Sequence, residues 1–156
     1  MLRFRVPFRM HRTGWFIPVF CIILGIEIGG LQLAIPIGAV LIASLLLHEI
    51  GHMLVATLLW VPVREIGMKF GGAYTRRAYA TRRRDEILIS AAGPLMNIAL
   101  AIPLSFVPHY GSQLAMCNLM LGAINLLPIS SSDGLRILKM LRHSGPPIDM
   151  ASTMKA

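Results

Sequence analysis

The sequence contains few charged residues and few cysteines. Charged residues make up 14% of its 156 residues, against about 25% in an ordinary soluble domain, so a water-facing surface of normal polarity cannot be built. Only two cysteines are present, Cys21 and Cys117, and both lie in apolar runs, which argues against a disulfide framework. Soluble globular, disordered and disulfide-stapled classes of protein are therefore excluded.

Hydrophobic and basic residues dominate what is present. Hydrophobic residues make up 55% of the chain, and the mean hydropathy is +0.67. Fifteen Lys and Arg outnumber seven Asp and Glu, which gives a net charge of +8. A basic balance can indicate nucleic-acid binding, but this apolar content predicts a membrane protein whose positive charges meet anionic lipids. We expect a lipid bilayer as partner and no nucleic acid.

Four stretches are long and apolar enough to cross a bilayer as helices, which takes about 20 residues each. No small-residue cleavage site follows the first of them, so we expect an uncleaved anchor there. The predicted fold is an all-α polytopic membrane protein that forms a single domain over residues 1–156. The four predicted spans cover approximately residues 15–33, 36–61, 87–107 and 112–128.

The basic residues predict how the spans are oriented. All fifteen lie before the first span, between the second and third, or after the fourth, and the loops near residues 29–30 and 108–112 contain none. By the positive-inside rule, both termini and the 62–86 loop are cytoplasmic. We therefore expect a multi-pass protein of the cell membrane.

The loop between the second and third spans has a pattern of its own. Two short segments, VREIGMKF and AYTRRAY, flank the pair Gly71-Gly72. This arrangement predicts a small cytoplasmic β-hairpin over residues 63–79. The polar tail from residue 143 is expected to be flexible.

The second span contains the sequence HEIGH, with His48, Glu49 and His52. Two histidines four residues apart share one face of a helix, so both can reach one metal ion, and the glutamate between them can act as a general base. The alternative is two core histidines and a stray acid. It is disfavoured because ionisable groups at mid-bilayer depth are costly and rare. The motif predicts one zinc ion per chain.

A two-histidine zinc site needs a third protein ligand, for which Asp133 is the best-placed acid. A helix from Gln113 to Leu127 would descend about 22 Å, to near the level of the histidines. Pro128 and the serines after it should end the helix there. The alternative is that Asp133 only caps a short interfacial helix. Glu27, near the outer end of the first span, is predicted to be an interfacial carboxylate.

Three segments together resemble the site-2 protease family of intramembrane zinc metalloproteases. They are HEIGH (48–52), AAGPLMN (91–97) and NLLPISSSDG (125–134), and the resemblance covers about residues 36–140. It implies a near-minimal catalytic core without an appended soluble domain. Asn97 matches a recurrent segment of the family, for which we expect a structural role first.

The resemblance also implies roles for individual residues. His48, His52 and Asp133 would bind zinc, Glu49 would be the catalytic acid and base, and Asn125 would lie near the substrate. The implied reaction is hydrolysis of peptide bonds within or near transmembrane segments of single-pass or membrane-anchored proteins. The hairpin is expected to help by pairing with an extended segment of the substrate as an added strand.

Two other functions remain as alternatives. A non-proteolytic, zinc-containing relative that binds transmembrane helices would need no base, so an intact Glu49 disfavours it. A zinc- or proton-coupled transporter would line a path across the membrane with polar groups, whereas the ionisable residues here converge on one level. The sequence leaves open the substrate's identity and a separate membrane partner that regulates access.

Overall fold

The structure is a computed structural model that describes residues 6–70 and 72–142. The expected flexible tail from residue 143 lies outside the described residues. Two short 3-10 helices, Arg12–Trp15 and Leu31–Leu33, precede the first two α-helices. The main elements are β1 (Phe8–Met10), α1 (Phe16–Gly29), α2 (Ala34–Leu58), β2 (Val63–Lys69), β3 (Gly72–Arg77), α3 (Arg83–Leu104), α4 (Gly111–Leu126) and α5 (Asp133–Arg142).

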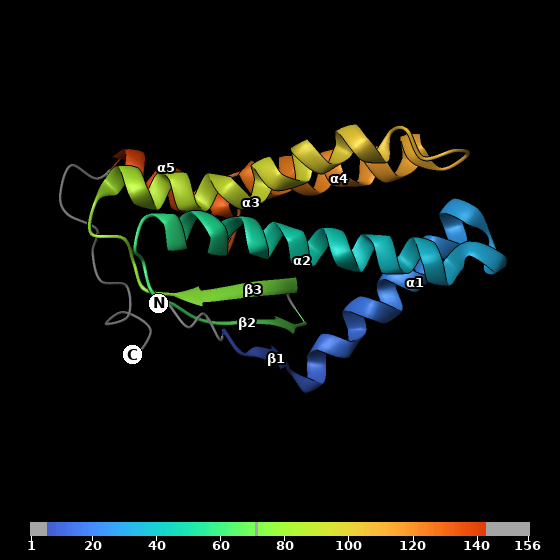
Figure 1. Ribbon diagram of the computed structural model, residues 1–156, viewed down its shortest axis with the longest axis horizontal. Coiled ribbons are helices and arrows are strands. Elements are labelled where there is room, and N and C mark those ends of the chain that lie inside the picture. Colours follow the sequence, from blue (N-terminus) through green and yellow to red (C-terminus); the bar gives the residue numbers. More distant parts are fainter. Residues whose placement is uncertain (1–5, 71, 143–156) are drawn as a thin grey trace.

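The helices form an elongated bundle centred on α2. This helix packs between α1 and α3, and α3 in turn packs against α4 and α5 (Figure 1). Small residues allow the close crossings. A Cβ atom on Gly38 would lie 3.1 Å from the Cα atom of Ile22 in α1. Close backbone approach of this kind is typical of helices that pack within a membrane.

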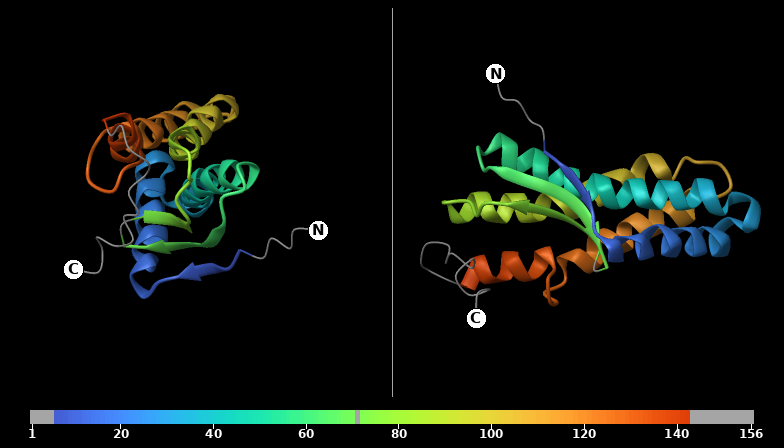
Figure 2. Two further views of the ribbon diagram at one scale, coloured as in Figure 1. Left: turned by 90° about the vertical axis from the view of Figure 1, so that its left-hand side faces the viewer. Right: turned by 90° about the horizontal axis from the view of Figure 1, so that it is seen from below.

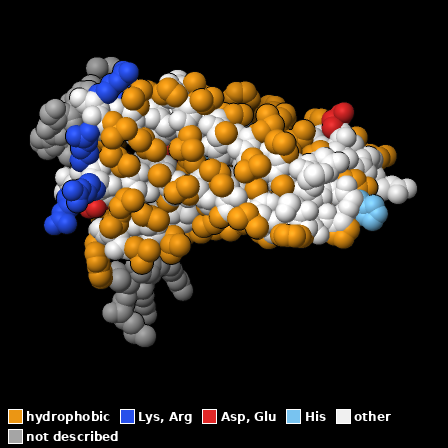
Figure 3. All heavy atoms as spheres, turned by 90° about the horizontal axis from the view of Figure 1, so that it is seen from above, with side chains coloured by type: hydrophobic (Ala, Val, Ile, Leu, Met, Phe, Trp, Pro, Cys, Tyr) orange, Lys and Arg blue, Asp and Glu red, His pale blue; other side chains and the backbone are white. Residues whose placement is uncertain are grey.

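The membrane character expected from the composition is confirmed in the described part of the chain. Three helical segments are long and apolar enough to cross a bilayer: Arg12–Gly29, Leu31–Leu58 and Arg83–Leu104. Hydrophobic side chains cover most of the face seen in Figure 3, and Lys and Arg gather at one end. α4 has 16 residues and a length of about 24 Å, which is short of the hydrocarbon core of about 30 Å.

A small three-stranded sheet lies along the half of α2 that contains HEIGH (Figures 1 and 2). The strand order is β1-β2-β3. β2 and β3 are antiparallel within the segment for which a hairpin was expected, with Lys69 opposite Gly72. β1 is parallel to β2, with Phe8 opposite Ile66. The sequence analysis missed β1 because a three-residue strand that pairs across two intervening helices leaves no local pattern.

A buried ion pair joins β3 to the start of α3. The Arg77 guanidinium donates to both carboxylate oxygens of Glu86, at 2.7 and 2.8 Å. The N–H of Ala80 donates to the same carboxylate at 3.0 Å. The two charged side chains are 5% and 1% exposed. This pair therefore fixes the end of β3 against the helical bundle.

Replacement of Arg77 by Met should lower the free energy of unfolding by about 3–5 kcal/mol, because Glu86 would be left buried without its counter-charge. Arg76→Met is a matched control. Arg76 has a side chain that is 62% exposed and contacts Glu65 at 3.4 Å, so its loss should cost at most about 1 kcal/mol. Thermal unfolding in one detergent measures both variants. Equal losses of stability would contradict the role given to the buried pair.

Candidate metal centre

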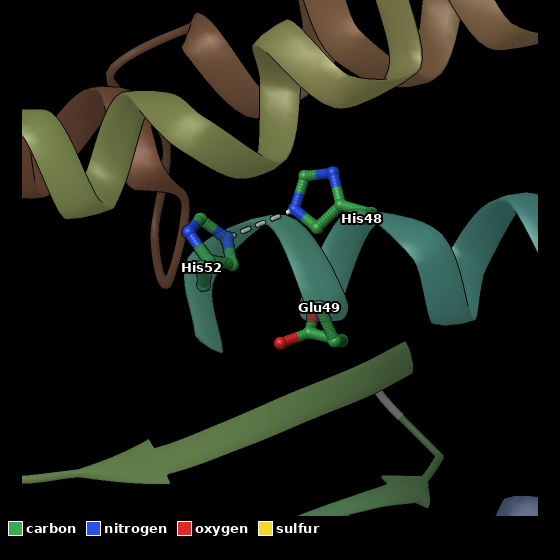
Figure 4. Close-up of side chains that lie close together, drawn as sticks. All are labelled: His48, Glu49 and His52. Atoms are coloured by element: carbon green, nitrogen blue, oxygen red, sulfur yellow. Dashed lines mark hydrogen bonds between the residues drawn. The ribbon is translucent and has the colours of Figure 1, made fainter. Parts of the chain in front are cut away.

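The residues of the HEIGH motif lie buried in α2. His48 and His52 are one helical turn apart, and their Nε2 atoms are 3.2 Å from each other. Glu49 projects from the same turn toward β3 (Figure 4). Each of the three residues offers a ligand atom, and these atoms all lie within 4.8 Å of one another. α2 thus presents two nitrogens at one point and a carboxylate beside them.

Asp133 reaches the histidines from a break between α4 and α5. Leu127, which precedes Pro128, is extended, with φ −67° and ψ 142°, because a proline disfavours the helical conformation in the residue before it. Ser131 then adopts a positive φ of 66°, and α5 begins at Asp133. The Asp133 Oδ2 atom lies 3.3 Å from Nε2 of His48 and 3.2 Å from Nε2 of His52.

Ser132, rather than Asp133, caps α5. The N–H of Leu135 donates to Ser132 Oγ at 3.1 Å, which is the usual hydrogen bond of an N-cap side chain. The carboxylate of Asp133 is directed at the histidines instead. Asp133 could have been a metal ligand or the cap of a short helix. In the structure Ser132 caps α5, and Asp133 faces the two histidines.

The ring orientation of both histidines is fixed by a bond on the side away from Asp133. Nδ1 of His48 lies 2.5 Å from Oδ1 of Asn97, and Nδ1 of His52 lies 2.7 Å from the carbonyl oxygen of Ile89. Since both partners are oxygen acceptors, each Nδ1 carries the proton and each Nε2 presents a lone pair. Bonds of this kind orient the imidazole ligands of metal sites.

The three facing atoms fit a zinc ion. Two lone-pair nitrogens and a carboxylate oxygen at these separations form a donor set that a cation among them stabilises. Zinc bonds of about 2.0–2.1 Å at tetrahedral angles place neighbouring ligand atoms about 3.3 Å apart. The three observed separations are 3.2, 3.2 and 3.3 Å. Two histidines and an aspartate also leave one of the four tetrahedral positions open.

A glycine of α3 makes room for this arrangement. A Cβ atom on Gly93 would lie 2.7 Å from Nε2 of His48 and still closer to Nε2 of His52. No side chain is tolerated at this position while the histidines hold their places. The GP pair of the AAGPLMN segment therefore has a steric function beside the metal centre.

A polar cavity of about 140 Å³ opens beside the three donor atoms. The edge of β3 from Ala73 to Thr75 forms one wall, and the Thr75 hydroxyl donates to the carbonyl oxygen of Glu49 at 3.3 Å. The structure brings all the predicted site residues to this one cavity, namely His48, Glu49, His52, Asn125 and Asp133.

Two other histidines and the acid of the first span lie elsewhere. The ring of His11 lies 6.2 Å from the ring of Tyr74 on the sheet and is tilted to it by 59°. His109 lies in the loop between α3 and α4, and Glu27 is exposed near the end of α1. None of these three lines the cavity.

Sequence analysis did not predict that Asn97 and Asn118 form a hydrogen-bond network with His48. Asn97 was expected to have a structural role, and it contacts a candidate ligand directly. Asn118 of α4 and Ser44 of α2 were not singled out, yet both are buried in the same network. Their one sequence signal is a polar side chain in the middle of an apolar helix, which in a membrane is directed at a polar partner.

Comparisons with known proteins agree with this geometry. The family model of peptidase family M50 matches residues 37–113. A zinc metalloprotease of Methanocaldococcus jannaschii is 30% identical over 148 residues, and Rip3 of Mycobacterium tuberculosis is 36% identical over 117. These alignments cover 87% and 65% of this chain, and the chain spans only 42% and 30% of the two relatives.

A solved structure is similar along the whole chain. The site-2 protease from Methanocaldococcus jannaschii superposes with a TM-score of 0.73 at 27% sequence identity. The match covers 100% of this chain and 76% of the solved one. The likeness therefore extends over the helices and the sheet as well as the motif.

Proposed function

The chain belongs to the site-2 protease family, peptidase family M50, and on this premise we propose that it is an intramembrane zinc metalloendopeptidase. Its reaction is the hydrolysis of peptide bonds within or near transmembrane segments of membrane-anchored proteins. The proposal rests on the triangle formed by Nε2 of His48, Nε2 of His52 and Oδ2 of Asp133, whose sides are 3.2–3.3 Å long. The Glu49 carboxylate lines the same cavity.

His48, His52 and Asp133 would hold one zinc ion per chain. When bound, zinc supplies Lewis acidity, which polarises a peptide carbonyl and makes a water molecule more acidic. Glu49 takes a proton from the attacking water and later passes it to the leaving amine. It projects from α2 toward β3 (Figure 4) and lines the same cavity as the three candidate ligands.

Asn125 would bind the substrate. It lines the cavity at the end of α4, and its Nδ2 atom donates to the carbonyl oxygen of Leu121 at 2.9 Å. An asparagine amide has a second N–H and an oxygen acceptor, which are left to pair with a peptide group. A contact with the substrate near the scissile bond follows from this position.

The edge of β3 would bind the substrate as an added strand. β3 is an outer strand of the sheet, and consecutive residues from Ala73 to Thr75 line the cavity. A helical substrate hides its carbonyls in hydrogen bonds, so a segment must unwind before it can be cut. Pairing with β3 gives the unwound backbone new partners and leads it past Glu49.

We propose that the fourth span, expected over residues 112–128, continues through the break into α5, so that Arg136, Lys139 and Arg142, which were expected after the span, lie in its cytoplasmic end. α5 packs along the N-terminal part of α3, and Arg83 Nη2 donates to the carbonyl oxygen of Leu141 near its end. α4 and α5 together are long enough to cross, while the unwound residues line a polar site, which is where a membrane tolerates such backbone. The basic residues at one end support a multi-pass orientation with both termini in the cytoplasm.

Replacement of Asp133 by Asn should reduce bound zinc from about one per chain to a small fraction, because a neutral amide is a poor zinc ligand. Cleavage of a tagged single-pass substrate in liposomes should be lost with the metal. Metal analysis and the cleavage assay on the same preparations measure both.

Asp85→Asn is the control for this substitution. Asp85 lies in the first turn of α3, outside the cavity, so its amide variant should keep both zinc and cleavage. Wild-type protein that contains no zinc, or zinc-loaded protein that cuts none of several single-pass substrates, would contradict the proposed function. The second result would favour a relative that binds transmembrane helices without cutting them.

A further inference from the structure

A chain of side-chain hydrogen bonds leads from His48 across three helices. Oδ1 of Asn97 in α3 faces Nδ1 of His48, and Nδ2 of Asn97 donates to Oδ1 of Asn118 in α4 at 3.0 Å. Nδ2 of Asn118 then donates to Oγ of Ser44 in α2 at 3.1 Å. All three polar residues beyond His48 are buried, with exposures of 0%, 1% and 4%.

Backbone carbonyls determine the direction of every bond in this chain. The Ser44 hydroxyl donates to the carbonyl oxygen of Val40 at 2.9 Å, so its oxygen is left to accept from Asn118. The second N–H of Asn118 donates to the carbonyl oxygen of Leu114 at 3.1 Å. Carbonyls can only accept. If the Asn118 amide turned over, its oxygen would therefore face the oxygen of Leu114.

The same reasoning extends to the candidate metal ligand. Nδ2 of Asn97 donates to Oδ1 of Asn118 and, at 3.5 Å, to the carbonyl oxygen of Ser44. Because both partners are acceptors, Asn97 must direct its NH₂ group away from His48 and its oxygen toward it. A reversed Asn97 would direct an N–H at Nδ1 of His48. The imidazole would then carry its proton on Nε2 and would have no lone pair to offer a metal ion.

We propose that Asn118 is a positioning residue for the metal centre, which acts through Asn97 to hold His48 in the tautomer whose Nε2 can bind zinc. This inference rests on the proposed function, since it assigns a purpose to the lone pair on Nε2. His52 is independent of Asn118, because its Nδ1 faces the backbone carbonyl of Ile89. The effect of Asn118 therefore falls on one of the two histidines.

Zinc affinity of the purified protein, measured by competition with a chelator, tests the proposal. Asn118→Leu keeps a similar volume but removes the shorter of the two hydrogen bonds that hold the Asn97 amide, which is 3.0 Å long against 3.5 Å for the bond to Ser44. Zinc should then bind about tenfold more weakly, the lower limit for loss of a group that orients a metal ligand. The visible spectrum of the Co²⁺-loaded protein should change as well, since it reports the ligand geometry.

Two further variants separate positioning from packing. Asn118→Asp, as the neutral acid that burial favours, still accepts from Asn97 through one oxygen and can donate to the carbonyl oxygen of Leu114 through its hydroxyl. Its zinc affinity should therefore stay within about threefold of wild type. Ala115→Gly, a helix-weakening change at a buried position of α4, should lower thermal stability and leave zinc affinity unchanged.

The results that would overturn the role of Asn118 differ from those that would overturn the proposed protease function. Wild-type protein without zinc affinity would contradict the proposed function itself. Wild-type affinity and an unchanged Co²⁺ spectrum in Asn118→Leu would overturn the positioning role. If Asn118→Leu does not fold, Asn118→Asp decides, because a tenfold loss of affinity there would contradict the need for an oxygen at that place.

Discussion

The Glu49→Gln protein is expected to bind zinc as wild type does and to cut its substrates about 10²- to 10⁴-fold more slowly. Glutamine keeps the shape of the side chain and its hydrogen bonding but cannot accept the proton of the attacking water. The zinc site stays because its three donor atoms belong to His48, His52 and Asp133. The measurement is single-turnover cleavage of a tagged single-pass protein in liposomes, with zinc counted in the same samples.

Glu65→Gln provides the matched control. Glu65 is also buried and lies on β2, where it accepts a hydrogen bond from Tyr74 at 3.0 Å, and it does not line the cavity. Its amide should leave cleavage within a few-fold of wild type. A Glu49→Gln protein that cuts at the wild-type rate would exclude Glu49 as the base, and a comparable loss in both variants would point to a structural cause.

Gly93→Ala should remove the metal, although the residue offers no ligand atom. The new methyl group would lie 2.7 Å from Nε2 of His48 and closer to Nε2 of His52. Either the imidazoles or α3 must then move by enough to break the triangle of donor atoms. Loss of more than about 100-fold in zinc affinity, the upper end for groups outside the ligand set, is expected, with loss of cleavage.

Gly122→Ala controls for packing in this comparison. Its Cβ would lie 2.9 Å from the carbonyl oxygen of Pro94, so the substitution also crowds a contact between α3 and α4. Overpacking should cost about 1–3 kcal/mol of stability and leave the zinc in place. Zinc affinity by chelator competition, beside thermal unfolding of the metal-free proteins, separates the two variants. Tight zinc binding by Gly93→Ala would show that the glycine has no special role.

The parts of the site that depend on short-range geometry could be predicted from the sequence. Two histidines four residues apart lie on one helical face by the period of the helix, and this holds for His48 and His52. The place of Asp133 followed from the length of the last apolar segment and from Pro128, which ends it. In the structure α4 ends at Leu126, and Asp133 comes within 3.3 Å of both histidines.

The parts that sequence analysis missed depend on pairing at a distance. β1 is parallel to β2 through contacts such as Phe8 with Ile66, and no local periodicity records a partner so far along the chain. The first predicted span, residues 15–33, is also interrupted at Gly30, which has a positive φ of 75°. Asn118 looked like one polar residue in an apolar helix, because its partners lie on two other helices.

The parallel pairing of β1 and β2 has a consequence for the order in which the protein is made. β1 leaves the ribosome first, but its partner strand follows only after α1 and α2 have been synthesised. Until then the unpaired N–H and C=O groups of β1 need water, since hydrocarbon gives them no partner. The segment before α1 must therefore wait on the side where β2 emerges. Completion of the sheet beside Glu49 is thus a late step in the synthesis of the chain, which follows that of α1 and α2.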